Sequence, residues 1–218
     1  IDAGDVDAAR AAAKCMQKIS TLGDSEDIVG DKSHVEGGLG NFRFCAASCV
    51  ETVPFFPGAK APSDDHSFSF AIGLENGGFA YELLKEAGHI GNIKHVFHTK
   101  MRDALMPIQG ICTKFVESGP GDVKFLGIDT SLNPSLDEGG SVADAIECLE
   151  EVHGDFGGSG SLAAAAAVTT SLQSIPDIFI TGYSGLMLPV LEDRCLAELG
   201  MASSNSSKLT IQKHLCVS

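Results

Sequence analysis

Hydrophobic positions recur along the chain with two different periods, one typical of helices and one typical of buried strands. Between residues 5 and 21, apolar residues recur three and four positions apart with polar residues between them, which predicts an amphipathic helix. Helical spacing or runs of strong helix formers predict the later helices at residues 78–86, 93–114, 141–152, 161–172 and 190–199. Pro107 is expected to kink or end its helix near Met106, because proline lacks the N–H that a helix interior uses.

Short apolar runs between these helices predict the strands. They cover residues 42–50, 67–74, 123–128, 178–181 and 209–217. Because strands alternate with helices, we expect βα units around a mainly parallel sheet, either open or closed into a barrel. No convincing linker divides the chain, so the pattern predicts a single α/β domain over residues 1–218.

Polar residues follow three of the predicted strands. Glu51 follows the first, Asp129 follows the strand 123–128, and Tyr183 and Ser184 follow the strand 178–181. Function in parallel sheets gathers at the carboxyl ends of the strands, so these four residues are expected to converge as candidate catalytic groups. Clustered carboxylates suit acid/base work or a hard metal ion, which makes Glu75 and Asp129 candidate metal ligands. The alternative is that these residues cap the helices that follow.

A glycine-dense segment precedes the alanine-rich helix at 161–172. Its residues Gly157, Gly158, Ser159 and Gly160 allow close backbone approach, and free N–H groups at a helix start attract anions. The segment lacks the lysine of a nucleotide-binding P-loop. It is therefore a candidate binding site for a phosphate or carboxylate, and the alternative is a turn before a tightly packed helix.

Two acidic residues, Glu192 and Asp193, stand at the predicted start of the last helix, shortly after Pro189. Negative charge at a helix start complements the helix dipole. We interpret this pair as stabilising the helix rather than as catalytic.

Composition narrows the function classes. The chain is acidic, with 29 Asp and Glu against 15 Lys and Arg and a net charge of −14, so we expect no nucleic-acid partner. No apolar run approaches the ~20 residues of a membrane span. Seven scattered cysteines are typical of reduced thiols, which predicts an intracellular protein, cytoplasmic or organellar. The chain does not begin with Met, and we expect it to be a portion of a longer protein.

Five segments together carry a family resemblance. They are Val53-Pro54-Phe55-Phe56-Pro57-Gly58-Ala59, Ser69-Phe70-Ala71-Ile72-Gly73-Leu74-Glu75, Phe125-Leu126-Gly127-Ile128-Asp129-Thr130-Ser131-Leu132, Phe156-Gly157-Gly158-Ser159-Gly160-Ser161-Leu162-Ala163-Ala164 and Gly182-Tyr183-Ser184-Gly185-Leu186-Met187-Leu188-Pro189-Val190-Leu191-Glu192-Asp193. In order and spacing they resemble domain-of-unknown-function family 711, also called uncharacterised protein family 0210 and often labelled PFL-like. The last segment is the most specific.

The resemblance implies an α/β barrel with surrounding helices, related to the pyruvate formate-lyase-like fold of glycyl radical enzymes and incomplete here at one or both ends. The resemblance does not identify a reaction, and it leaves the cofactor unknown, because fold does not fix chemistry. Our leading hypothesis is a protein that binds a small anionic metabolite, with or without a metal, in strand-end loops. The alternative is a non-catalytic structural or assembly subunit, including a homo-oligomer, or a metabolite sensor.

Overall fold

The computed structural model describes residues 4–20, 68–119, 121, 123–152 and 156–201. The chain divides into two units, Ile1–Asp65 and His66–Ser218, and each is described by itself. In the first unit, α1 (Val6–Ile19) confirms the first predicted helix. Asp5 caps it by accepting a hydrogen bond from the Ala8 N–H at 2.9 Å. A single domain over the whole chain stays a prediction.

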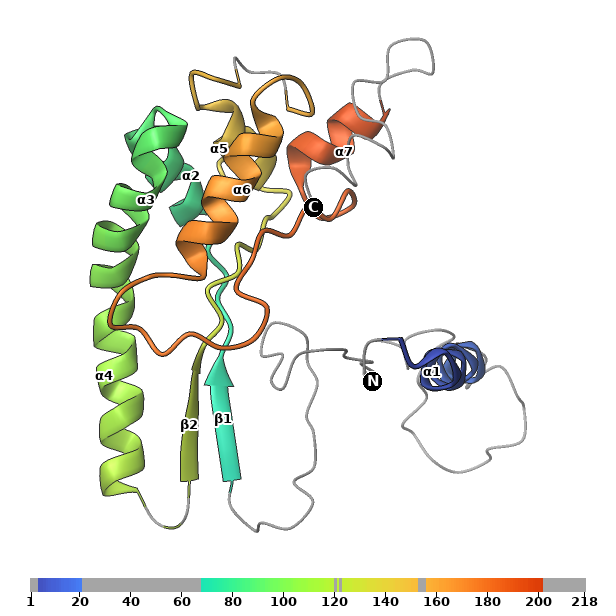
Figure 1. Cartoon of the computed structure of the whole chain (residues 1–218), viewed down its shortest axis with the longest axis vertical. Helices are drawn as coiled ribbons and strands as arrows, with labels where there is room; N and C mark the ends of the chain where they lie inside the picture. The colour runs from blue at the N-terminus through green and yellow to red at the C-terminus, as the bar shows by residue number, and fades with distance from the viewer. Residues whose placement is uncertain (1–3, 21–67, 120, 122, 153–155, 202–218) are drawn as a thin grey trace. The chain divides into compact units, whose positions relative to one another are not determined.

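The second unit contains a small parallel sheet (Figure 1). Strands β1 (Phe68–Ile72) and β2 (Val123–Ile128) confirm two of the predicted strands. A third segment, residues 179–186, runs parallel to β2 and is joined through the isolated bridges Ile128–Ile180 and Leu132–Leu186. The predicted strand at 178–181 is thus reduced to a bridge, and the predicted strands at 42–50 and 209–217 lie outside the described residues.

A glycine lets the third segment approach the sheet. Gly127 has φ of +116°, and a Cβ at this position would overlap the carbonyl oxygen of Phe179. The Ile128 N–H donates to the same oxygen at 2.7 Å. The backbone of β2 is therefore bonded to β1 on one side and to the third segment on the other.

Helices follow the strands as the pattern predicts. After β1 come α2 (Gly77–Ala87), η2 (Ile90–Asn92), α3 (Ile93–Val96), η3 (Phe97–Met101) and α4 (Arg102–Ser118). After β2 come α5 (Val142–Glu147), α6 (Ser161–Leu172) and α7 (Arg194–Met201). Figure 1 shows α3, η3 and α4 as one long rod beside the sheet. Phe70 of β1 packs edge-on against Phe115 of α4, with 5.9 Å between ring centroids.

The expected end of the helix near Met106 is wrong. Residue 107 lies inside α4, which continues to Ser118. Pro107 itself is exposed, whereas Leu105 and Gln109 on either side of it are buried. Packing of these neighbours holds the helix together, because tertiary contacts commonly outweigh local propensity.

The core of the second unit lies between the helices and the carboxyl edge of the sheet. Its largest fully buried side chains are Phe97, Phe156, Leu84, Ile93, Met101, Ile128, Leu132, Ile146, Leu149, Leu172, Leu196 and Val142. The fold is mixed α/β with parallel strands, as expected. Within the described residues the sheet has two strands and no barrel is seen, so closure into a barrel stays a prediction. No helix in the described ranges has the length and apolarity needed to cross a bilayer.

Candidate functional site

The loops after β1, β2 and the third segment meet at the carboxyl edge of the sheet. Asn76, 8% exposed, fixes the first two loops together. Its side-chain amide donates to the Ser131 carbonyl at 3.1 Å and accepts from the Asn133 N–H at 2.9 Å. Neighbouring parallel strands thus bring their end loops together, as the sequence predicted.

Asp129 joins the second loop to the third. It is 1% exposed. Its Oδ1 accepts from the Ser131 N–H at 3.0 Å, the Ser131 hydroxyl at 2.5 Å and the Ser184 N–H at 2.9 Å. Its Oδ2 accepts from the Tyr183 N–H at 3.1 Å. The structure therefore brings Asp129, Tyr183 and Ser184 together, with the carboxylate bonded to the backbone of the other two residues.

Ser184 is bonded internally as well. It is 2% exposed, with φ of +46°. Its hydroxyl donates to the Thr181 carbonyl at 2.9 Å and accepts from the Thr130 N–H at 3.1 Å. Tyr183, by contrast, is 44% exposed, and its phenol donates to the Leu186 carbonyl at 3.4 Å. In this conformation the Asp129 and Ser184 side chains hold two loops in register, the loop after β2 and the loop of the third segment.

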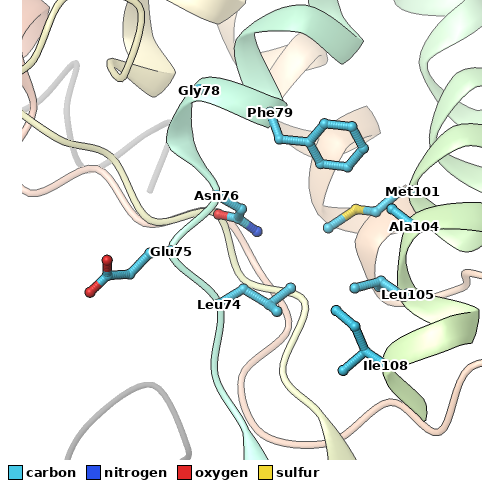
Figure 2. Close-up of a pocket in the computed structure, with 9 residues that line it drawn as sticks. All are labelled: Leu74, Glu75, Asn76, Gly78, Phe79, Met101, Ala104, Leu105 and Ile108. Carbon is cyan, nitrogen blue, oxygen red and sulfur yellow. The ribbon is translucent and has the colours of Figure 1, made fainter. Parts of the chain in front are cut away.

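Glu51 and Glu75 are the two other acidic residues that the sequence predicted for the site. Glu51 is outside the described residues. Glu75 is exposed, and Figure 2 shows its carboxylate pointing away from the neighbouring side chains. The structure does not aim Glu75 and the buried Asp129 at a common point, and their metal-binding role stays a prediction.

The glycine-dense segment is at the opposite end of α6. The Thr130 hydroxyl donates to the Leu172 carbonyl at 2.9 Å, which places the last residue of α6 at the sheet edge. The 12-residue helix puts Gly157–Gly160 about 18 Å away at 1.5 Å per residue. The glycine-dense segment therefore does not lie beside Asp129.

Local packing accounts for two of these glycines. The Gly157 N–H donates to the Ser161 hydroxyl at 2.9 Å. Gly160 has φ of +90°, and a Cβ there would overlap the Glu151 carbonyl oxygen. Anion binding by Gly157, Gly158, Ser159 and Gly160 stays a prediction.

A cavity opens where β1 leads into α2 (Figure 2). Its volume is about 350 Å³. It is lined by Leu74, Glu75, Asn76, Gly78, Phe79, Met101, Ala104, Leu105 and Ile108. It lies at the carboxyl end of a parallel strand, where α/β proteins bind ligands.

The start of α2 forms one rim of this cavity. Asn76 is the N-cap residue, and its own side chain makes no capping hydrogen bond to the helix. The Ala80 N–H is the first to bond back, to the Asn76 carbonyl at 2.8 Å. The N–H groups of Gly77, Gly78 and Phe79 therefore have no partner within the helix. Sequence reasoning missed this feature, although Asn76-Gly77-Gly78 directly after a strand was the available signal.

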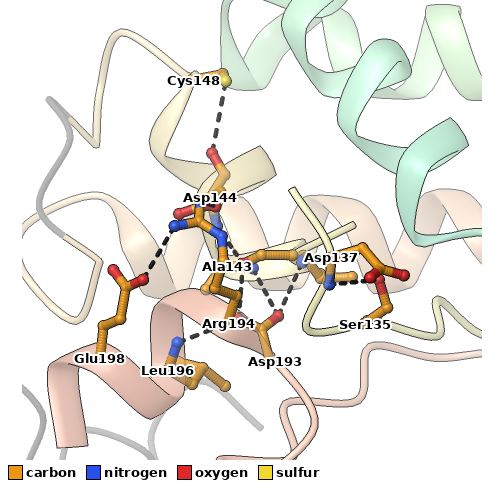
Figure 3. Close-up of polar contacts among 11 residues, drawn as sticks. Ser135, Asp137, Ala143, Asp144, Cys148, Asp193, Arg194, Leu196 and Glu198 are labelled. Atoms are coloured by element: carbon orange, nitrogen blue, oxygen red, sulfur yellow. Dashed lines mark hydrogen bonds and ion pairs between the residues drawn. The ribbon is translucent and has the colours of Figure 1, made fainter. Parts of the chain in front are cut away.

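One residue of the predicted acidic pair at the last helix, Asp193, has a structural role (Figure 3). Asp193 is fully buried. It accepts from the Ser141 hydroxyl at 2.6 Å and from the N–H groups of Val142 and Ala143 at 2.8 and 3.2 Å. It also accepts from the Leu196 N–H at 3.1 Å. One carboxylate thus caps α5 and α7 together, which goes beyond the helix-start role that the sequence predicted.

A second polar group lies beside this double cap. Asp144, Glu147 and Cys195 place ligand atoms within 4.8 Å of one another. A cation already occupies the neighbourhood, because Arg194 pairs with Asp144 and, at 3.0 Å, with Glu198. Burial, followed by the Glu147 and Asp144 carboxylates, raises the pKa of the Cys195 thiol well above its usual value. The thiol is therefore protonated at neutral pH.

Comparison with known proteins supplies a family and no reaction. No curated protein and no solved structure matches the chain. A family model described as Uncharacterised ACR (DUF711) matches residues 2–218.

Proposed function

The chain belongs to the DUF711 family, and from its own geometry we propose that it binds a small anionic metabolite at the start of α2. The observation that carries the proposal is the cavity of about 350 Å³ beside an uncapped helix start. This volume is at the lower end of the range for small-molecule pockets, ~300–1,000 Å³. The proposed site keeps the strand-end location expected from the sequence but uses the loop after β1.

The first turn of α2 supplies the chemistry for an anion. Free N–H groups and the helix dipole together attract negative charge at a helix start. Gly78 lines the cavity and has no side chain to cover its N–H. Gly77 has a different role, because a Cβ there would overlap the Gly140 carbonyl oxygen. That close contact holds the helix start against the loop after β2.

Binding without catalysis is the second candidate function. The polar side chains that line the cavity belong to Glu75 and Asn76. Asn76 is already bonded on both sides of its amide, to the Ser131 and Asn133 backbone. Glu75 points away from the other lining residues (Figure 2). This arrangement favours a metabolite sensor over an enzyme.

A matched pair of variants at Gly78 tests the proposal. Gly78→Pro removes one N–H that the helix does not use, since proline is tolerated in the first turn. Gly78→Ala keeps the N–H, and its Cβ makes only an ordinary contact, 3.7 Å from the Gly139 oxygen. We expect Gly78→Pro to weaken binding of inorganic phosphate or acetate about tenfold or more, because a hydrogen bond to a charged group contributes ~1.5–3 kcal/mol. Gly78→Ala should bind like the parent protein.

Isothermal titration calorimetry measures the affinities, and circular dichroism checks that both variants fold. Equal binding by the proline and alanine variants would place the anion elsewhere. Glu75→Gln separates the anion proposal from a metal site. It should leave anion binding unchanged or stronger through loss of a like charge, whereas a metal bound by Glu75 would be lost.

A further inference from the structure

The wall of the α2 cavity is apolar over most of its surface. Its side chains other than Glu75 and Asn76 carry only carbon and sulfur: Leu74, Phe79, Met101, Ala104, Leu105 and Ile108. Met101, Ala104, Leu105 and Ile108 follow at helical spacing, so the wall of η3 and α4 extends about 10 Å at 1.5 Å per residue. A bare inorganic anion would leave this surface in contact with water.

Part of the wall is exposed in the structure. Phe79, in the first turn of α2, is 39% exposed. Ala104 is exposed and Ile108 is half-buried, whereas Met101 and Leu105 at the back are 1% and 4% exposed. The cavity thus has a preformed apolar back and an apolar mouth, next to N–H groups that favour negative charge.

We propose that the ligand is an amphiphilic anion, with a carboxylate or phosphate head at the start of α2 and a hydrocarbon chain along Met101–Ile108. This inference rests on the proposed function, because it assigns the head to the same helix start. Covering the wall removes apolar surface from water, and each methylene that becomes buried strengthens binding about fourfold, from ~0.8 kcal/mol per CH₂. The helix start favours the charged head of the ligand, and the apolar wall favours its hydrocarbon chain.

A series of straight-chain carboxylates tests the chain-length dependence. Acetate, butanoate, hexanoate and octanoate are titrated into the full chain by calorimetry at fixed salt. The affinity should rise about fourfold per methylene and level off once the wall is covered. The same series of alkyl phosphates tells which head is preferred.

A matched pair of methionine variants locates the chain. Ala104→Met extends a flexible apolar side chain into the cavity from an exposed helical position. Ala166→Met makes the same change at an exposed position of α6 that does not line the cavity. We expect Ala104→Met to lower the octanoate affinity at least tenfold and the acetate affinity by a smaller factor, because acetate has no hydrocarbon chain to lose its contact with the wall. Ala166→Met should leave both affinities unchanged.

The outcomes separate the two proposals. If acetate and phosphate bind through the Gly78 N–H but affinity does not depend on chain length, the amphiphilic ligand is excluded and the anion site stands. A length dependence that Ala104→Met does not alter would also overturn the inference, since the chain would bind elsewhere. If no anion binds at any length, the proposed function fails with it.

Discussion

Replacing Asp129 tests whether this residue holds the loops or carries out chemistry. The parent carboxylate accepts four hydrogen bonds from Ser131, Tyr183 and Ser184 while almost fully buried. Asp129→Asn keeps the shape and replaces one oxygen by an NH₂ group. With the remaining oxygen at the Oδ1 position, the NH₂ would face the Tyr183 N–H, donor against donor.

The cost follows from the unsatisfied groups. A buried polar group without a partner costs ~1–3 kcal/mol, and the retained hydrogen bonds lose their charge assistance. We therefore expect Asp129→Asn to lower the free energy of unfolding by about 3 kcal/mol. Asp129→Ala leaves the three N–H groups and the Ser131 hydroxyl without this acceptor, so we expect about 5 kcal/mol.

Urea denaturation followed by circular dichroism at the helix band measures both losses. Asp137→Asn is the matched control, because it makes the same change at an exposed position of the loop after β2 and should stay within about 0.5 kcal/mol of the parent. Asp129→Asn with parent stability and abolished ligand binding would refute the structural role. It would restore Asp129 as a candidate catalytic group.

Two further results are expected from the region around α5 and α7. Asp193→Ala should destabilise the protein by about 3 kcal/mol, because a lost cap costs ~0.5–2 kcal/mol and two helices lose theirs, whereas Glu192→Ala at the neighbouring exposed position should change little in the same urea titration. Iodoacetamide at pH 8 should label the exposed Cys15 quickly and spare Cys195 in the folded protein, because the raised pKa of Cys195 leaves little thiolate at that pH. Mass spectrometry measures the labelling, and rapid modification of Cys195 in the folded protein would contradict a buried, protonated thiol.

Much of the fold could be predicted from local pattern. The segment 123–128 is an uninterrupted apolar run and forms β2 within the predicted bounds. The alanine-rich segment forms α6 over the predicted residues 161–172. The predicted start at Ser141 agrees with the structure, where the Ser141 hydroxyl caps α5 by accepting from the Asp144 N–H at 3.0 Å. These signals depend on neighbours in sequence, which a period or a capping residue records directly.

The arrangement of the site depended on contacts distant in sequence. Parallel strand ends predicted that Asp129 would lie near Tyr183 and Ser184, and the structure joins them by hydrogen bonds. The sequence could not predict that the Asp129 carboxylate is already occupied by hydrogen bonds, because two of its donors are N–H groups 54 and 55 residues away along the chain. The distance to Gly157–Gly160 depended on the direction of α6, which residue composition does not record.

The uneven distribution of hydrogen-bond acceptors among the helix starts is the reason for proposing α2 as the binding site. Asp193 satisfies the starts of α5 and α7, and Asp129 satisfies the N–H groups of the loops after β2 and the third segment. The starts of α2 and α6 lack a side-chain cap, and the cavity of about 350 Å³ lies at α2. An acidic chain has little positive charge to hold an anion, so unpaired backbone N–H groups beside a cavity are its best available means. A ligand at α2 would thus supply the acceptor that no carboxylate of the described residues supplies there.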